Sequence, residues 1–278
     1  MIIDYKTELI HEHTAIACVS EFLIDACMIL ETKDKKEELE DFDLPIGVIL
    51  QCIANSHKLD FIRLAKQDGS KQQRIINILK AILKPRHTKA VALYQSASKD
   101  KIIDELKPHQ YIHKYLTDNT STTHEQTVIA QRTVRHLDEA FSLTKQDLTL
   151  KIGQRLYRGV SITEVQLQEF FDAADTGTPL THKNYMSTSL SESIAKAFSA
   201  LSYLGKLREN PDDASTLEPV VIELTNRRND LEFILPDALK LVNHNQGQME
   251  VLLPRNIKIL PTHFELDEFN AKIYADIV

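Results

Sequence analysis

A short stretch near the C-terminus, Gln248-Met249-Glu250-Val251-Leu252-Leu253-Pro254, carries the pattern that decides the fold. Side chains alternate along a β-strand, so Gln248 and Glu250 point to one face while Met249, Val251 and Leu253 point to the other. An amide and a carboxylate side by side, backed by an apolar row, can form the floor of a cleft. Taken alone, the pattern also fits an edge strand whose polar face meets solvent.

Two earlier motifs favour the cleft. Arg158 lies in Arg155-Leu156-Tyr157-Arg158-Gly159, and Ser187-Thr188-Ser189 precedes a helical segment. An arginine, a serine and a glutamate therefore follow one another along the chain, each on a short strand-like stretch.

The composition is that of a globular protein. The chain has 278 residues, of which 42% are hydrophobic and 26% charged, and its formal net charge is −7. This length suits one large domain or two ordinary ones. The negative charge argues against a nucleic-acid partner, because phosphates require a basic face.

The N-terminal region indicates a reducing compartment. Cys18, Cys27 and Cys52 lack metal-ligand spacing, which predicts buried thiols, and a Cys18–Cys27 disulfide would be awkward within one predicted helix. Residues 1–6 lack the features of a secretory signal, and the apolar run 15–30 is too short and too acidic to span a bilayer. We expect a protein made in the cytoplasm without a membrane span. Delivery to a host cell would then need no classical signal peptide.

Hydrophobic spacing divides the chain into a helical part and a strand-rich part. Helices are predicted over 75–83, ended by Pro85, over 111–116, and over 124–141 behind a cap at Thr122 or Thr123. The inner side of the third is expected to hold Val128, Thr133, Leu137, Ala140 and Phe141.

From residue 156 onward, β-rich stretches dominate. They are 156–160, 185–189, 219–225, 231–234, 249–253 and 257–260, with helices at 163–174 and 190–204. This order predicts an α+β fold, with an all-helical N-terminal region followed by a mixed β-sheet domain with flanking helices.

The ordered motifs resemble the mono-ADP-ribosyltransferase family, a group of toxins and effectors defined by an Arg, a Ser-Thr-Ser and a Gln/Glu-x-Glu motif. The resemblance begins with a Leu-Asp-x-Ala-Phe-like helix end at 137–141 and continues through Tyr157-Arg158-Gly159, Tyr185-Met186-Ser187-Thr188-Ser189 with Ala197-Phe198, and 248–255. It covers residues 105–278, which we expect to form the catalytic domain. Residues 1–104 would be a helical domain of unknown role.

The resemblance implies transfer of ADP-ribose from NAD, used as a substrate, to a target protein, with loss of nicotinamide. Glu250 would stabilise the oxocarbenium-like transition state through the nicotinamide-ribose 2′-hydroxyl. Arg158 would bind an NAD phosphate, and Ser187 would orient Glu250.

Three further residues complete the expected NAD site. Gly159 would let the nicotinamide amide approach the backbone. Thr188 is expected to be near NAD, although shaping the strand is the more plausible role for it and for Ser189. Phe198 fits the nicotinamide pocket and the core equally well.

Gln248 bears on the acceptor. A carboxamide is not a base but can hydrogen-bond another amide. The chain therefore resembles the Gln-x-Glu branch, which includes clostridial Rho-modifying exoenzymes that act on asparagine, and an Asn or Gln acceptor is favoured over Arg. Two alternatives stay open, an NAD glycohydrolase and an inactive NAD-binding or interaction module. No metal is expected, since His11 and His13 lack ligand spacing.

Overall fold

The computed structural model describes six stretches of the chain, residues 69–95, 101–118, 122–209, 217–239, 250–266 and 271–278. The predictions for the three cysteines, for the apolar run 15–30, and for Gln248 and Met249 lie outside these residues. The predicted boundary near residue 104 stays a prediction.

Four helices form the first part of the described chain: α3 (Gly69–Ile82), α4 (Pro85–Tyr94), α5 (Pro108–Thr117) and α6 (His124–Thr144). The helices predicted around 75–83, 111–116 and 124–141 are confirmed as α3, α5 and α6. The hydroxyl of Thr123 accepts from the Gln126 amide, so Thr123 is the cap of α6. The sequence pattern does not predict α4, because Pro85 ends one helix and, as a residue favoured in the first turn, also begins the next.

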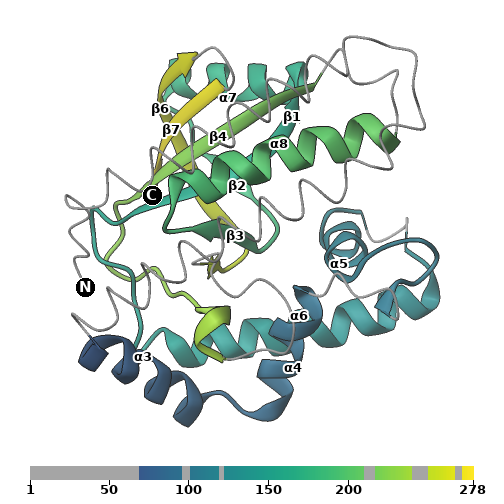
Figure 1. The fold of residues 1–278 in the computed structure, drawn as a ribbon, viewed down its shortest axis with the longest axis vertical. Helices are drawn as coiled ribbons and strands as arrows, with labels where there is room; N and C mark the ends of the chain where they lie inside the picture. The colour runs from purple at the N-terminus through teal and green to yellow at the C-terminus, as the bar shows by residue number, and fades with distance from the viewer. Residues whose placement is uncertain (1–68, 96–100, 119–121, 210–216, 240–249, 267–270) are drawn as a thin grey trace.

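A seven-stranded mixed sheet with the order β2-β6-β7-β4-β1-β3-β5 forms the second part. All neighbouring strands are antiparallel except β4 and β7, which are parallel. Figure 1 shows α8 (Glu192–Glu209) lying along the sheet, with α3 to α6 gathered at the side of β3. The remaining elements are β1 (Arg155–Thr163), α7 (Glu164–Thr176), β2 (Leu180–His182), β3 (Met186–Ser189), β4 (Leu217–Asn226), the 3-10 helix η4 (Pro236–Leu239), β5 (Glu250–Leu253), β6 (Ile257–Leu266) and β7 (Ala271–Ile277).

The α+β class is confirmed, and three details of the prediction are wrong. Residues 231–234 form only isolated bridges and no strand. Both β2 and β7 were missed, since β2 has three residues and β7 alternates buried with half-buried positions around polar side chains. Val128 is 49% exposed, because this side of α6 faces away from the core that holds Leu137 and Phe141.

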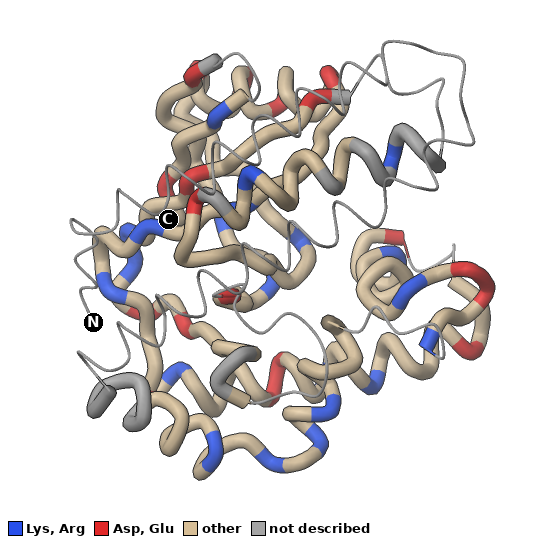
Figure 2. Tube along the Cα trace, viewed as in Figure 1, with Lys and Arg blue, Asp and Glu red and all other residues tan. Residues whose placement is uncertain are grey.

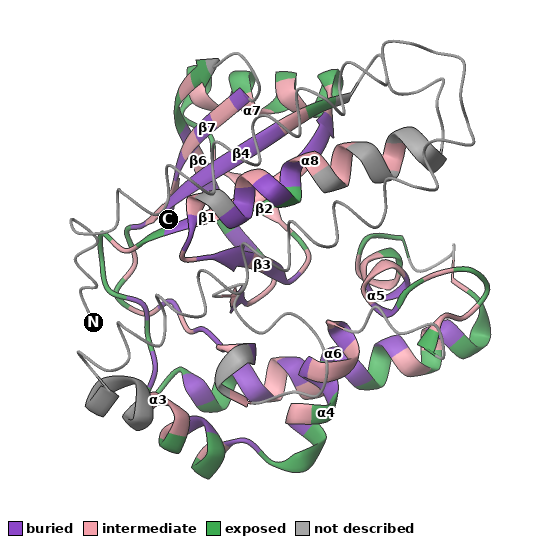
Figure 3. Cartoon of the chain, in the orientation of Figure 1, coloured by how far each residue is buried: buried purple, intermediate pink, exposed green. Residues whose placement is uncertain are grey.

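One continuous core joins the helices to the sheet (Figure 3). Leu79 of α3 and Tyr111 of α5 belong to the same cluster of buried side chains as Leu156 of β1 and Ile273 of β7. Burial of such side chains contributes about 1.5–3 kcal/mol each relative to exposure. The helices therefore have fixed positions beside the sheet.

Asp138 anchors α6 to the sheet and explains part of the Leu-Asp-x-Ala-Phe pattern. Its carboxylate accepts from Nε of Arg255 at 3.0 and 3.2 Å, from Nη2 of Arg255 at 2.9 Å, and from the Tyr185 hydroxyl at 2.7 Å. The ring of Phe141 stacks on Tyr185 with centroids 5.8 Å apart. These contacts hold β3, which begins at the next residue, against α6.

Candidate active site

Arg158 lies near the middle of the sheet. It is on β1, between β4 and β3, and its Nη1 donates to the main-chain oxygen of Ser187 at 2.8 Å. Burial lowers the pKa of Arg158, while nearby Tyr94 and Glu250 act in the opposite direction. A guanidinium keeps its charge at neutral pH and has five N–H groups. Only one of them has a protein acceptor among the described residues, so the others are available to an anion.

Glu250 begins β5, the strand at the end of the sheet, directly opposite Ser189 of β3. Its side chain is half-buried, and it lies within electrostatic range of both Arg158 and Tyr94. Val251 and Leu253 are fully buried, as the sequence predicts, but Leu252, at the alternate position shared with Glu250, is fully buried too, so burial does not alternate along β5. Arg158 and Glu250 are 92 positions apart in sequence, yet the fold brings them close enough for their charges to interact.

The Ser-Thr-Ser motif divides into three roles. Ser187 gives its main-chain oxygen to Arg158, and no described residue bonds its hydroxyl. Thr188 is buried and donates to the Val251 oxygen at 2.7 Å, which fastens β3 to β5. The Ser189 hydroxyl accepts from the Ser191 amide at 3.0 Å, just before α8. Thr188 and Ser189 therefore have the structural contacts expected, and an orienting bond from Ser187 to Glu250 stays a prediction.

Gly159 is required by helix packing. A Cβ placed there would lie 1.7 Å from the main-chain oxygen of Ala195 and 2.6 Å from the amide nitrogen of Ser199, both on α8. These backbone atoms cannot move aside without shifting the helix. The proposed approach of nicotinamide to Gly159 is not tested by this packing. Phe198, also on α8, is 37% exposed and so is not a core residue.

Three residues near Arg158 were not predicted from the sequence. They are Tyr94 at the end of α4, His113 on α5, and His182 at the end of β2. Each interacts electrostatically with Arg158. Burial, and then the positive charge of Arg158, lower the pKa of His113 and of His182 to about 3. Both imidazoles are therefore neutral at physiological pH. No motif marks these residues, because they lie on separate segments that meet only in the folded chain.

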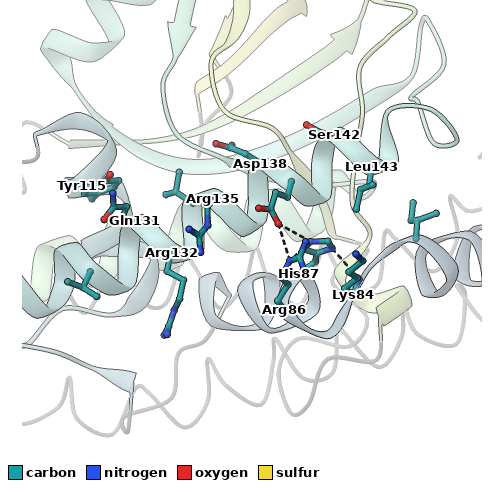
Figure 4. Close-up of a pocket in the computed structure, with 14 residues that line it drawn as sticks. Lys84, Arg86, His87, Tyr115, Gln131, Arg132, Arg135, Asp138, Ser142 and Leu143 are labelled. Atoms are coloured by element: carbon teal, nitrogen blue, oxygen red, sulfur yellow. Dashed lines mark hydrogen bonds and ion pairs between the residues drawn. The ribbon is translucent and has the colours of Figure 1, made fainter.

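A separate cavity of about 970 Å³ lies against the outer side of α6. Figure 2 shows the Lys and Arg positions along α4 and α6, and Figure 4 shows Arg132 and Arg135 projecting from α6 toward this space. Glu139 bonds Arg86 at 3.0 Å and His87 at 3.3 Å. Arg158, Ser187 and Glu250 do not line the cavity.

Two general features are absent from the described residues. They contain no group of three His, Cys, Asp or Glu side chains that could hold a metal ion. None of their helices combines the length and hydropathy needed to cross a membrane.

Solved structures similar to this chain include bacterial ADP-ribosyltransferases. HopU1 of Pseudomonas syringae pv. Tomato DC3000 is 13% identical over 69% of this chain and 76% of its own, with a TM-score of 0.50. The Vis toxin from Vibrio splendidus is 18% identical over 77% and 85%, with a TM-score of 0.48. Exoenzyme S from Pseudomonas aeruginosa is 13% identical over 82% and 88%, with a TM-score of 0.47.

No curated protein sequence matches the chain. The family model of the ADP-ribosyltransferase exoenzymes matches residues 86–274, well over half of the chain and all of the residues placed in the site above. The chain therefore belongs to the ADP-ribosyltransferase exoenzyme family and is an NAD-dependent mono-ADP-ribosyltransferase.

Proposed function

We propose that the enzyme transfers ADP-ribose from NAD to the side-chain amide of an asparagine or glutamine in a target protein. The bond between ribose C1′ and nicotinamide breaks, and nicotinamide leaves with the electron pair. A bond then forms between C1′ and the acceptor nitrogen, which gives up a proton. The target protein is the partner implied, and NAD is consumed as a substrate.

The observation that carries this proposal is that Glu250, at the start of β5, lies within electrostatic range of Arg158 on β1. Glu250 would face the positive charge that develops on the ribose, and a fixed carboxylate of this kind stabilises an oxocarbenium-like transition state. The unused N–H groups of Arg158 would bind a phosphate of NAD in a bidentate manner. The Ser187 hydroxyl, which no described residue bonds, would orient Glu250.

Three other residues have supporting roles in the proposal. Gly159 and Thr188 would form the wall of the nicotinamide site through their backbone, since their side-chain positions face α8 and β5. Phe198 is exposed enough to contact nicotinamide.

Gln248 supports an amide acceptor. It precedes Glu250 by two residues, a spacing of roughly 6.5–7 Å along a strand, and alternation predicts a common face for the two side chains. A carboxamide can both donate to and accept from the acceptor amide, but it cannot remove a proton from arginine. Release of the enzyme from the cell that makes it, as the word exoenzyme implies, is a further prediction.

The test compares two rates in wild type and in Gln248→Ala. Labelled NAD and a lysate report transfer to protein, with mass spectrometry of the modified residue, and NAD alone reports nicotinamide release to water. We expect a sharp fall in transfer and little change in release. An equal fall in both rates, or an arginine as the modified residue, would contradict an amide acceptor. Rapid NAD hydrolysis with no protein labelled would favour the glycohydrolase alternative.

A further inference from the structure

The hydroxyl of Tyr94 fixes which nitrogen of His113 carries a proton. It lies 3.0 Å from the main-chain oxygen of Tyr185 and 2.8 Å from Nε2 of His113. A carbonyl oxygen can only accept, and a phenol has a single proton to donate. The Tyr94 proton therefore goes to Tyr185, and His113 must donate from Nε2 to the Tyr94 oxygen.

His113 consequently has a free acceptor. A neutral imidazole carries one proton, so protonation at Nε2 leaves Nδ1 with an unshared electron pair. Within the described chain no residue donates to Nδ1, and this atom is not among the buried polar atoms that lack a partner. An acceptor that solvent can reach and no protein group uses is suited to a ligand.

The surroundings of His113 place this acceptor at the Arg158 site. His113 interacts with Arg158 and with His109, one turn earlier on α5, and His182 interacts with both Arg158 and His113. Nε2 of His182 is buried without a hydrogen-bond partner in the described chain. Two neutral imidazoles thus flank the guanidinium and add no positive charge beside it.

We propose that Nδ1 of His113 accepts a hydrogen bond from an O–H or N–H donor of NAD bound against Arg158, such as a ribose hydroxyl. This inference rests on the proposed NAD site and adds a binding residue to it. Tyr94 acts through His113 as a positioning residue, since its bond to the Tyr185 oxygen holds the imidazole in the tautomer that leaves Nδ1 free.

Two substitutions test the roles of Nδ1 and Nε2 of His113 separately. The amide oxygen of Asn lies close to the position of Nδ1, and the amide nitrogen of Gln lies close to that of Nε2. His113→Asn should retain NAD affinity within about twofold while losing the bond to Tyr94. His113→Gln should retain the bond to Tyr94 and weaken NAD binding about 3- to 10-fold, the worth of one neutral hydrogen bond.

His109→Gln is the matched control. His109 is on the same helix, with its ring centroid 6.1 Å from that of His113, and burial lowers its pKa too. Calorimetric titration with NAD, and separately with ADP-ribose and with nicotinamide, would report the affinities of all variants. If His113→Gln has a weaker affinity for ADP-ribose, the donor belongs to the ribose or adenine part of NAD. If its affinity is weaker only for NAD and nicotinamide, the donor is the carboxamide.

Nitrogen-15 spectra of the imidazoles provide a readout that does not depend on activity. His113 should show the Nε2–H tautomer, and its Nδ1 signal should shift when NAD is added. An Nδ1–H tautomer, or NAD affinity of His113→Gln equal to that of wild type, would overturn the inference. If wild type itself fails to bind NAD, the proposed function is overturned as well, so the two failures are distinct.

Discussion

Tyr157 and Arg158 are adjacent on β1, and their side chains lie in two charged clusters that differ in how far the charges are paired within the protein. The ring of Tyr157 lies 5.9 Å from Nζ of Lys272, which is 2.9 Å from Glu223 and 3.1 Å from Glu192. Arg158 is on the other face of the strand. Its one hydrogen bond to a described residue goes to a main-chain oxygen, and its electrostatic neighbours include two neutral histidines.

The difference distinguishes a structural cluster from a binding cluster. The Lys272 ammonium meets two carboxylates and two aromatic rings, and together they join α8, β4 and β7, so the charge is already compensated. Hydrogen bonds to those carboxylates help to raise the pKa of Lys272 despite its burial. Around Arg158 the described residues leave several donors and acceptors without partners, such as the Ser187 hydroxyl and Nε2 of His182, an arrangement that a ligand would complete.

The largest effect is expected at Glu250. Glu250→Gln keeps the shape of the side chain and removes the charge that faces the developing cation, so ADP-ribose transfer should fall by about 10²–10³-fold. The thermal unfolding temperature should stay unchanged. Transfer within threefold of wild type would remove Glu250 from the mechanism.

Lys272→Met should reduce the free energy of unfolding by about 3 kcal/mol, because it leaves the Glu223 carboxylate buried without its main partner. The exposed fractions of the two side chains are 16% and 7%. Denaturant unfolding measures this loss, and the KM for NAD of the folded fraction should not change. Unaltered stability would mean that the cluster is not structural.

Arg158→Lys is the corresponding substitution on the opposite face of β1. Lysine keeps the charge and loses the fork of donors, so the Kd for NAD should rise about tenfold or more. The unfolding free energy should change by less than that of Lys272→Met. Unaltered NAD affinity would show that the phosphate contact lies elsewhere.

Acid should destabilise the protein through His113 and His182. Both have pKa values of about 3 in the folded chain, against 6.5 when unfolded. The unfolded state therefore binds more protons between these values, and stability falls as the pH drops below 6.5. Each histidine contributes at most about 1.4 kcal/mol per pH unit. Replacing both by Gln should flatten the dependence of unfolding free energy on pH between 6.5 and 4, and an unchanged slope would contradict their neutral state.

The smallest effect is expected at Arg155, which lies 3.4 Å from Glu223 with a side chain 66% exposed. An exposed pair of this kind contributes about 0–1 kcal/mol. Arg155→Gln should therefore lower the unfolding free energy by less than 1 kcal/mol. A loss as large as that of Lys272→Met would show that exposure does not separate the two cations.

The sequence by itself determined the fold class and the order of most helices and strands, and it identified Arg158, Ser187 and Glu250 as candidate site residues. Local patterns were sufficient for the helices and strands, since Thr123 caps α6 and the apolar run of Val251 to Leu253 forms the buried part of β5. The motif residues were recognisable because their order and neighbours are distinctive.

Tertiary structure alone decided which residues surround the motif. Tyr94, His113 and His182 have no local pattern, and only the packing of α4, α5 and the end of β2 around β1 brings them near Arg158. The requirement for Gly159 likewise depends on the close approach of α8, which no property of neighbouring residues reveals. Contacts between distant segments are set by how whole elements fill the core, and a linear sequence does not display that packing.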